Sequence, residues 1–166
     1  YIVTLGGFTV YPYQERSTPL KMRTKKGREL LAFLLDAGSK GATKEQIYEA
    51  LWFDSDSDDV KKLIGVNLAQ IKKDLAVLGV EEPVVNEKGF YSIRRDEIVV
   101  DTDLLEAAAK KIKGEINLEI AREYLDLYKG EYLSEFEAHW AAAKRLKYAA
   151  LYEEIKTYYL QNHMPT

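Results

Sequence analysis

The stretch DVKKLIGVNLAQIKKDLAVLG, residues Asp59–Gly79, carries the clearest structural pattern in the chain. Its large aliphatic residues recur every three or four positions, which is the spacing that puts side chains on one face of an α-helix. These residues are Val60, Ile64, Leu68, Ile71, Leu75 and Leu78. We therefore predict an amphipathic helix over residues 59–78, anchored to the rest of its domain along this face.

The opposite face of this helix is basic and includes several small side chains. Its lysines are Lys61, Lys62, Lys72 and Lys73. No acidic residue lies between Asp59 and Asp74. Such a helix can enter the major groove of DNA, which is wide enough to admit it. The pattern also fits an ordinary solvated helix, so the choice between the two interpretations depends on the surrounding sequence.

The composition is that of a globular protein and argues against several classes of site. The 166 residues are 46% hydrophobic and 31% charged, which suits one large domain or two small ones. There is no cysteine and there are only two histidines, so we expect no disulfide, no metal site and no cofactor. No apolar run approaches the roughly 18 residues of a membrane span and no signal peptide is recognisable, so we expect a cytoplasmic protein without a membrane partner.

Net charge does not identify a partner. The formal net charge is −3, which is unfavourable for a protein that binds a polyanion. Residues 1–100 contain equal numbers of basic and acidic residues, and the acidic excess lies in residues 101–166. Because a polyanion needs a local basic face rather than a basic total, nucleic acid remains a candidate partner. The chain begins at Tyr1 inside an apparent strand, so we expect it to be part of a longer protein.

Strands and two shorter helices are predicted before residue 59. Residues 1–13 are rich in β-branched and aromatic residues around a Gly-Gly pair, which predicts two strands joined by a tight turn. Thr24 is a candidate N-cap for one helix, and Thr43 opens a capping-box pattern for the next.

The first turn of the first of these helices contains Lys25 and Lys26. Cations at a helix N-terminus are unfavourable because they oppose the helix dipole, and a nearby phosphate backbone would compensate for this cost. A solvated basic turn explains them equally well.

A β-hairpin and then a helical region follow the 59–78 helix. Asn86–Gly89 has turn-forming residues between apolar pairs, which predicts a hairpin over residues 84–93 with a four-residue tip. From Asp101 onward the pattern is helical, with helices expected over 102–113, 117–129 and 134–162. We therefore predict an α+β domain over residues 1–100 and an all-α domain over residues 101–166.

The order of elements in residues 1–100 is strands, three helices and a hairpin. This is the order of a winged-helix domain, a variant of the helix-turn-helix. In that arrangement the 59–78 helix is the recognition helix in the major groove. The 84–93 hairpin is the wing, which touches the DNA backbone or the minor groove.

Several segments resemble a known family. LGGFTVY, TKKGRELLAFLLDAG, TKEQIYEALW, VNLAQIKKDL and GFYSI resemble the DNA-binding domain of OmpR-type response regulators, and more closely that of the antibiotic-regulatory-protein (SARP) activators. YKGEYLSEFEAHWAAAKRLKYAALYEEI and the Val100–Asp103 junction are similar to the bacterial transcriptional activator domain of those regulators, a tetratricopeptide-like (TPR-like) helical array. The resemblance covers essentially the whole chain, and it implies an array longer than the one in this chain, which would then be truncated.

The resemblance implies DNA contacts at particular positions. The groove-reading positions of the family fall on Lys62, Gly65, Ala69 and Gln70. Lys72 and Lys73 fall near phosphates, and Asn67 matches a position that often contacts the DNA backbone. Lys61 on the same helix and Lys88 at the wing tip join Lys25 and Lys26 as further basic candidates.

Base-edge chemistry limits what these residues can read. Gln70 can pair with adenine, Lys62 with guanine, and Val66 can touch a thymine methyl group. Gly65 and Ala69 offer a base no hydrogen bond, so backbone contacts and DNA shape are expected to contribute more.

The main hypothesis is a DNA-binding transcriptional activator, and the resemblance implies the output part of a two-component response regulator. Its partners would be double-stranded DNA, RNA polymerase and a second copy of the chain. The alternative is a protein-interaction module whose winged helix no longer binds DNA. An enzyme is not expected, because no phosphate-binding loop, nucleophile motif or metal-ligand spacing occurs. Lys25, Lys26, Lys62, Lys72, Lys73 and Lys88 should share one face if the first hypothesis holds.

Overall fold

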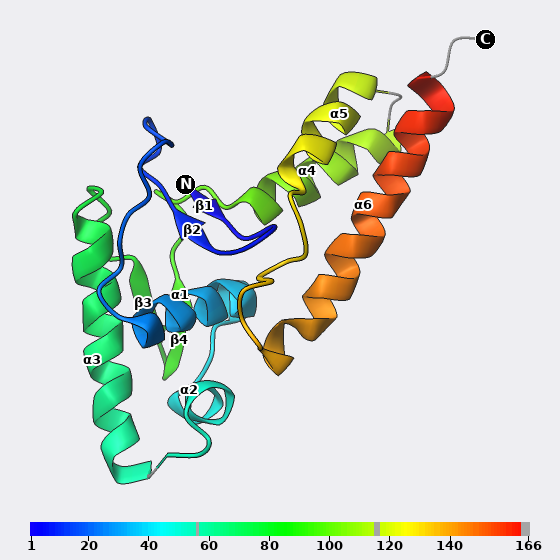
Figure 1. The fold of residues 1–166 in the computed structure, drawn as a ribbon. Coiled ribbons are helices and arrows are strands. Elements are labelled where there is room, and N and C mark those ends of the chain that lie inside the picture. Colours follow the sequence, from blue (N-terminus) through cyan, green and yellow to red (C-terminus); the bar gives the residue numbers. More distant parts are fainter. Residues whose placement is uncertain (56, 115–116, 164–166) are drawn as a thin grey trace. The chain divides into compact units, whose positions relative to one another are not determined.

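The computed structural model describes residues 1–55, 57–114 and 117–163. Within these residues the chain is a mixed α+β protein with two small antiparallel sheets and six α-helices (Figure 1). None of the helices in these ranges is long and apolar enough to cross a bilayer.

The chain divides into two compact units. The unit called here the hairpin unit comprises Tyr11–Ile98 with Ala138–Trp140. The second, called here the helical unit, comprises Tyr1–Val10, Val99–Glu137 and Ala141–Thr166. This division differs from the expected boundary at residue 100, because the first ten residues group with the helices that follow the hairpin.

Three helices and a hairpin form most of the hairpin unit. The helices are α1 (Lys25–Ala37), α2 (Lys44–Leu51) and α3 (Ser57–Ala76), with a short 3-10 turn, η1 (Gly38–Lys40), after α1. The hairpin consists of β3 (Val84–Glu87) and β4 (Phe90–Ile93). The predicted 59–78 helix is thus present, begins two residues earlier and ends two residues earlier than expected. The expected hairpin bounds are those observed.

The aliphatic stripe of α3 is the centre of the unit's core. Val60, Ile64, Leu68, Ile71 and Leu75 are all buried, as the sequence spacing predicts. They pack against α1 and α2, whose own buried side chains include Leu30, Leu34, Ile47 and Leu51. The opposite face of α3 therefore remains available at the surface.

Side chains cap the two shorter helices as expected. The Thr24 hydroxyl accepts the Gly27 N–H at the start of α1. At the start of α2, Thr43 accepts the Gln46 N–H, and the Gln46 side chain accepts the Thr43 N–H. These are the reciprocal bonds of a capping box, and they satisfy donors that the helix itself leaves unpaired.

The hairpin ends in a two-residue turn rather than the expected four-residue tip. Lys88 and Gly89 have φ angles of 53° and 85°, and Glu87 pairs directly with Phe90. Two successive left-handed residues define a type I′ turn, whose twist matches that of the flanking strands. Asn86, expected in the tip, belongs to β3 and accepts the Gly89 N–H with its side chain.

Backbone pairing attaches the hairpin to the turn before α2. Ala42 and Tyr91 exchange both backbone hydrogen bonds, each 2.8 Å long. A Cβ on Gly41 would lie only 2.6 Å from the Tyr91 carbonyl oxygen, so a glycine is needed beside this pairing. The hairpin is therefore fixed relative to the helices of its unit.

The helical unit combines three helices with the N-terminal strands. β1 (Ile2–Val3) and β2 (Thr9–Val10) pair antiparallel around the Gly6-Gly7 turn, as the sequence predicts. The helices are α4 (Asp101–Gly114), α5 (Leu118–Leu127) and α6 (Ala142–His163), and α5 packs against both others.

The last helix begins later than the expected residue 134. Residues 131–133 instead pair with the N-terminal segment: the Gly6 N–H donates to the Glu131 carbonyl, and the Leu133 N–H donates to the Thr4 carbonyl. Leu133 has a φ angle of 50°, which is not helical. The Arg145 guanidinium binds the carbonyls of Tyr132, Leu133 and Phe136. Only a 3-10 turn, η2 (His139–Ala141), precedes α6.

Asp101 joins the N-terminal strands to α4. Its carboxyl group is buried and accepts the Thr4 N–H and the Leu5 N–H, each at 2.9 Å, and the Thr4 hydroxyl at 2.6 Å. Burial raises the pKa of this carboxyl, and the hydrogen bonds from Thr4, Leu5 and Thr102 oppose that effect. These bonds explain why the first residues group with the helical unit.

We expect Asp101→Ala to lower the free energy of unfolding by roughly 3 kcal/mol, because it leaves buried donors without an acceptor. Urea denaturation followed by circular dichroism measures this. Asp103→Ala is the control, since Asp103 is exposed in the same helical turn. Equal losses in both variants would contradict the assigned role.

Candidate nucleic-acid interface

The exposed face of α3 combines cations with small or aliphatic side chains. Beyond the first turn of α3 the exposed residues are Lys61, Lys62, Leu63, Gly65, Val66, Ala69, Lys72, Lys73 and Ala76. Across residues 60–76, all described by the structure, the only acid is Asp74, which is 5% exposed. The surface of α3 beyond its first turn therefore displays positive charge without a compensating exposed acid.

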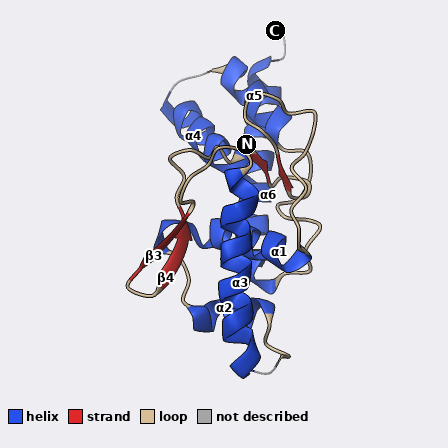
Figure 2. Cartoon of the chain, turned by 90° about the vertical axis from the view of Figure 1, so that its left-hand side faces the viewer, coloured by secondary structure: helices blue, strands red, loops and turns tan. Residues whose placement is uncertain are grey.

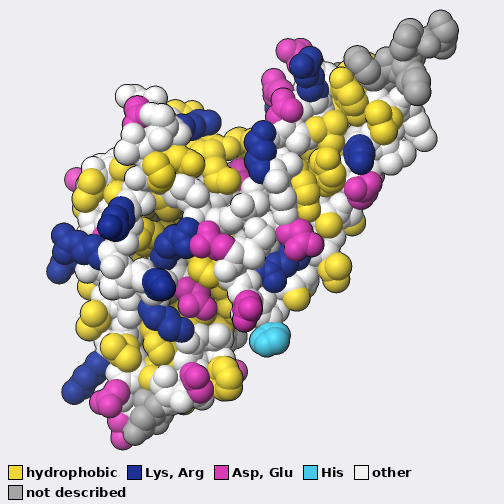
Figure 3. Space-filling view, in the orientation of Figure 1, with side chains coloured by type: hydrophobic (Ala, Val, Ile, Leu, Met, Phe, Trp, Pro, Cys, Tyr) yellow, Lys and Arg dark blue, Asp and Glu magenta, His cyan; other side chains and the backbone are white. Residues whose placement is uncertain are grey.

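The space-filling view shows this distribution. Lys and Arg side chains lie along the left edge of the hairpin unit, where α3 runs, and acidic side chains gather at the lower end (Figure 3). Asp58 and Asp59 lie in the first turn of α3, where negative charge is favourable to the helix dipole. The basic part of the face thus begins one turn into the helix.

The hairpin lies beside α3. Figure 2 shows β3 and β4 projecting on one side of α3, with α1 on its other side, and β3 contacts α3 directly. Lys88 is exposed at the hairpin tip, and Lys25 is exposed in the first turn of α1. These two candidate cations therefore lie on elements that flank α3.

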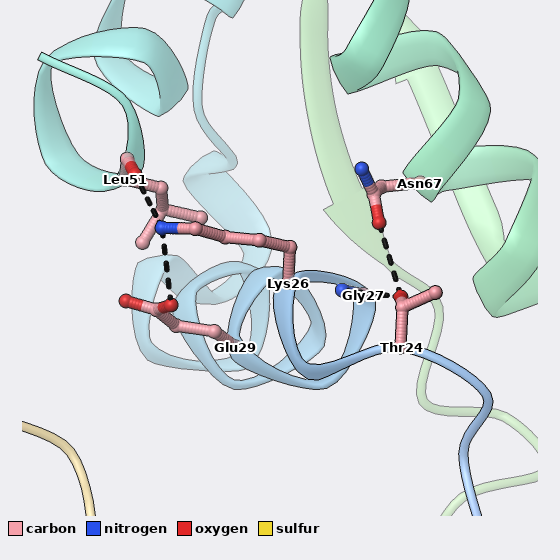
Figure 4. Close-up of polar contacts among 6 residues, drawn as sticks. All are labelled: Thr24, Lys26, Gly27, Glu29, Leu51 and Asn67. Atoms are coloured by element: carbon pink, nitrogen blue, oxygen red, sulfur yellow. Dashed lines mark hydrogen bonds and ion pairs between the residues drawn. The ribbon is translucent and has the colours of Figure 1, made fainter. Parts of the chain in front are cut away.

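Lys26 is placed differently from the other candidate lysines. Its ammonium donates to the Leu51 carbonyl at 2.6 Å and lies 3.5 Å from a Glu29 carboxyl oxygen (Figure 4). The ammonium also sits 5.3 Å from the centre of the Trp52 ring. A cation on the last carbonyls of a helix satisfies an unpaired acceptor and complements the dipole. Lys26 caps α2 and does not join the exposed face of α3.

Asn67 is also placed for packing rather than for contact with a partner. Asn67 is 7% exposed, and its amide nitrogen donates to the Leu63 carbonyl at 2.8 Å. Its amide oxygen accepts the Thr24 hydroxyl at 3.2 Å (Figure 4). A Cβ on Gly27 would lie 2.7 Å from the Thr24 hydroxyl oxygen. Asn67 therefore ties α3 to the capped start of α1 and lies beneath the exposed face of α3.

We expect Asn67→Ala to lower the free energy of unfolding by about 1 to 3 kcal/mol, because it leaves the Thr24 hydroxyl without its acceptor and removes the side-chain bond to the Leu63 carbonyl. Urea denaturation measures the change. Lys62→Ala, on the exposed face of the same helix, should stay within about 0.5 kcal/mol of the wild type. An Asn67→Ala protein as stable as Lys62→Ala would refute the packing role.

Gln70 is held by its neighbours. Its amide nitrogen donates to an Asp74 carboxyl oxygen at 2.9 Å. The other Asp74 oxygen lies 3.4 Å from the backbone nitrogen of Arg23, in the segment that enters α1. The orientation of the Gln70 amide is therefore set from within the protein.

Sequence reasoning missed Arg23 as a candidate. Its side chain is exposed, and its backbone lies against α3 through the Asp74 contact. The sequence signal for Arg23 is its place in the basic run that includes Lys25 and Lys26. Residues 19–23 form no strand in the structure.

The described residues contain no cluster of three or more His, Cys, Asp or Glu side chains that could hold a metal ion. The chemistry available at the α3 face is therefore that of cations, an amide and aliphatic groups.

Comparison with known proteins supports the fold. No family model and no curated protein matches the chain. Among solved structures, Mycobacterium tuberculosis EmbR, in complex with a low-affinity phosphopeptide, is similar with a TM-score of 0.73 and 16% sequence identity. The match covers 94% of this chain and 43% of the EmbR chain. This chain thus shares its fold with less than half of EmbR.

Proposed function

We propose that the hairpin unit is a winged-helix DNA-binding domain and that the protein is a transcriptional regulator of the SARP kind. The observation that carries the proposal is the exposed face of α3, with four lysines and no exposed acid from residue 60 to residue 76. Its buried stripe anchors the helix, so the basic face can meet a partner without unpacking the core.

The dimensions and charge of α3 suit the major groove. The helix has 20 residues. At a rise of about 1.5 Å per residue it is roughly 30 Å long, enough to lie in the groove across several base pairs. Lysines on both sides of the small residues Gly65 and Ala69 would neutralise phosphates, while those residues let the helix backbone approach the bases.

The hairpin serves as the wing in this proposal. Its attachment through Ala42 and Tyr91 holds it beside α3, and its rigid two-residue turn presents Lys88. A cation in that place would contact the DNA backbone.

The helical unit would be the TPR-like bacterial transcriptional activator domain. This assignment rests on the sequence resemblance and on α4, α5 and α6, which pack as successive neighbours. RNA polymerase as a partner, a homodimer on two half-sites and a role in a two-component system are further proposals that follow from the same resemblance.

The test is DNA binding by the full chain and by the Lys62→Ala, Lys73→Ala double variant. Duplexes selected from a randomised library provide the probe, and fluorescence anisotropy at several salt concentrations gives the affinity. Each lost phosphate contact should make the slope of log affinity against log salt less steep by about 0.9, so we expect a change of about 2.

The matched control is the Lys110→Ala, Lys111→Ala double variant. Both of these lysines are exposed on α4, in the other unit, and the net charge changes by the same amount. This control should bind as the wild type does. If the wild-type chain selects no duplex, or if both double variants lose the same affinity, DNA binding through α3 is excluded and the protein-interaction module becomes the better hypothesis.

Lys88→Asn tests the wing separately. Asparagine tolerates the left-handed conformation that this turn requires, so the hairpin should persist while the charge is lost. We expect weaker DNA binding and a salt slope less steep by about 1. Lys88→Arg, which keeps the charge, should bind as the wild type does; an unchanged affinity in Lys88→Asn would remove the wing from the interface.

A further inference from the structure

A hollow of about 320 Å³ lies between α4 and α6 in the helical unit. Its apolar lining is aliphatic: Ala109 and Ile155 are buried, and Ile112 and Leu151 are half-buried. Small-molecule sites in proteins begin at about 300 Å³ and are lined mostly by apolar side chains with a few polar groups. The hollow therefore has the size and the lining of a site for a small ligand with an apolar part.

Two polar contacts show how α4 and α6 face each other around the hollow. The Lys147 ammonium on α6 donates to the Glu106 carboxyl group on α4 at 3.0 Å. The Tyr158 hydroxyl on α6 accepts the N–H of Asn117, the residue that caps α5, also at 3.0 Å. The partners are 41 positions apart in both contacts. The chain therefore passes α6 in a constant register from Glu106 to Asn117, and residues with this spacing lie opposite each other.

Lys113 and Glu154 have the same spacing and line the hollow from opposite helices. Both side chains belong to exposed residues. Within the part of the chain that the structure describes, neither charge has an ion-pair partner. One cation and one anion beside an aliphatic lining complement a small zwitterion that carries an apolar side chain.

A buried hydroxyl group without a partner lies close by. Tyr124 of α5 is fully buried, and its hydroxyl makes no hydrogen bond to any described residue. Burial raises the pKa of Tyr124, and the charges of Glu154 and Glu106 raise it further, which places the hydroxyl near both walls. Buried polar groups in proteins are almost always hydrogen-bonded, so this donor leaves a bond open to water or to a bound molecule.

We propose that the helical unit binds a free apolar α-amino acid in the hollow between α4 and α6, with the ligand's carboxylate on Lys113 and its ammonium on Glu154. The ligand's side chain would lie against the aliphatic lining. Residues inside a peptide chain carry neither of these main-chain charges, so the two charged walls favour the free amino acid. The site is independent of α3 and of DNA binding.

The experiment titrates the isotopically labelled full chain with L-leucine and with L-phenylalanine and follows the backbone amide signals by NMR. We expect saturable shifts in the signals of residues that line the hollow. N-acetyl-L-leucine lacks the ammonium charge and L-leucinamide lacks the carboxylate. Each should bind about fivefold more weakly than L-leucine, the loss that corresponds to one exposed ion pair.

Charge reversal tests the two walls. Lys113→Glu and Glu154→Lys should each weaken L-leucine binding at least about fivefold, because both walls then carry the same sign. The double variant restores one charge of each sign and should recover binding, with the ligand turned around. An apolar surface without charge recognition would bind equally in all of these variants.

Lys111→Glu and Glu153→Lys are the matched controls. Both residues are exposed on the same two helices, and neither lines the hollow. These variants should bind L-leucine as the wild type does. Because all four substituted residues are exposed, every variant should keep the wild-type melting temperature, which separates a lost contact from a lost fold.

Three results would overturn the proposal. They are the absence of saturable shifts with either amino acid, an affinity that N-acetylation leaves unchanged, and full binding in either single charge reversal. Tighter binding of an end-blocked leucine-rich peptide than of L-leucine would also overturn it and would assign the hollow to a protein partner. The duplex-binding measurements do not depend on any of these results, so the two proposals fail separately.

Discussion

The hydrogen bond from the Thr24 hydroxyl to Asn67 sets the relation between α1 and α3. The same hydroxyl caps the start of α1 by accepting the Gly27 N–H, so one oxygen both caps α1 and joins it to α3. The close approach leaves no room for a Cβ on Gly27. The direction of α3, and with it the direction of its basic face, depends on this junction and on the buried stripe of α3 that packs against α1 and α2.

A second attachment fixes the hairpin. The Ala42–Tyr91 pairing adds the turn before α2 as a short third strand beside β4, so the hairpin is not an isolated ribbon. Isolated two-stranded hairpins are marginally stable in water. The helix face and the turn that carries Lys88 are therefore held by contacts that use no residue of the proposed interface.

The sequence predicts the helices well because each leaves a local signal. Burial of the α3 stripe follows from spacing, and the starts of α1, α2 and α5 follow from Thr24, Thr43 and Asn117. The late start of α6 was not predictable, because its cause is pairing between residues 131–133 and the distant N-terminus. The grouping of residues 1–10 with the helical unit has the same long-range origin.

The site was predictable as a face but not residue by residue. Spacing alone puts the four lysines and Val66 on the outside of α3, and the structure agrees. Lys26 and Asn67 are also polar residues near that face, yet their partners, Leu51 and Thr24, are distant in sequence. Arg23 is held against α3 by the contact between its backbone nitrogen and the Asp74 carboxyl, which is also distant in sequence. For a polar side chain near the edge of a helix face, the local sequence pattern does not tell whether it meets solvent or a distant segment.

The position of the strands also bears on how the chain is made. Residues 1–10 are synthesised before the rest of this sequence, but their partners at Asp101 and residues 131–133 appear about a hundred residues later. Residues 11–98 emerge in between and contain the three helices and hairpin of one unit almost entirely. That unit can assemble during synthesis, whereas the other closes only when its late segment returns to the first residues, since long-range pairing waits for both partners. The hairpin unit can therefore fold before the helical unit, although the first residues of the helical unit are synthesised earlier.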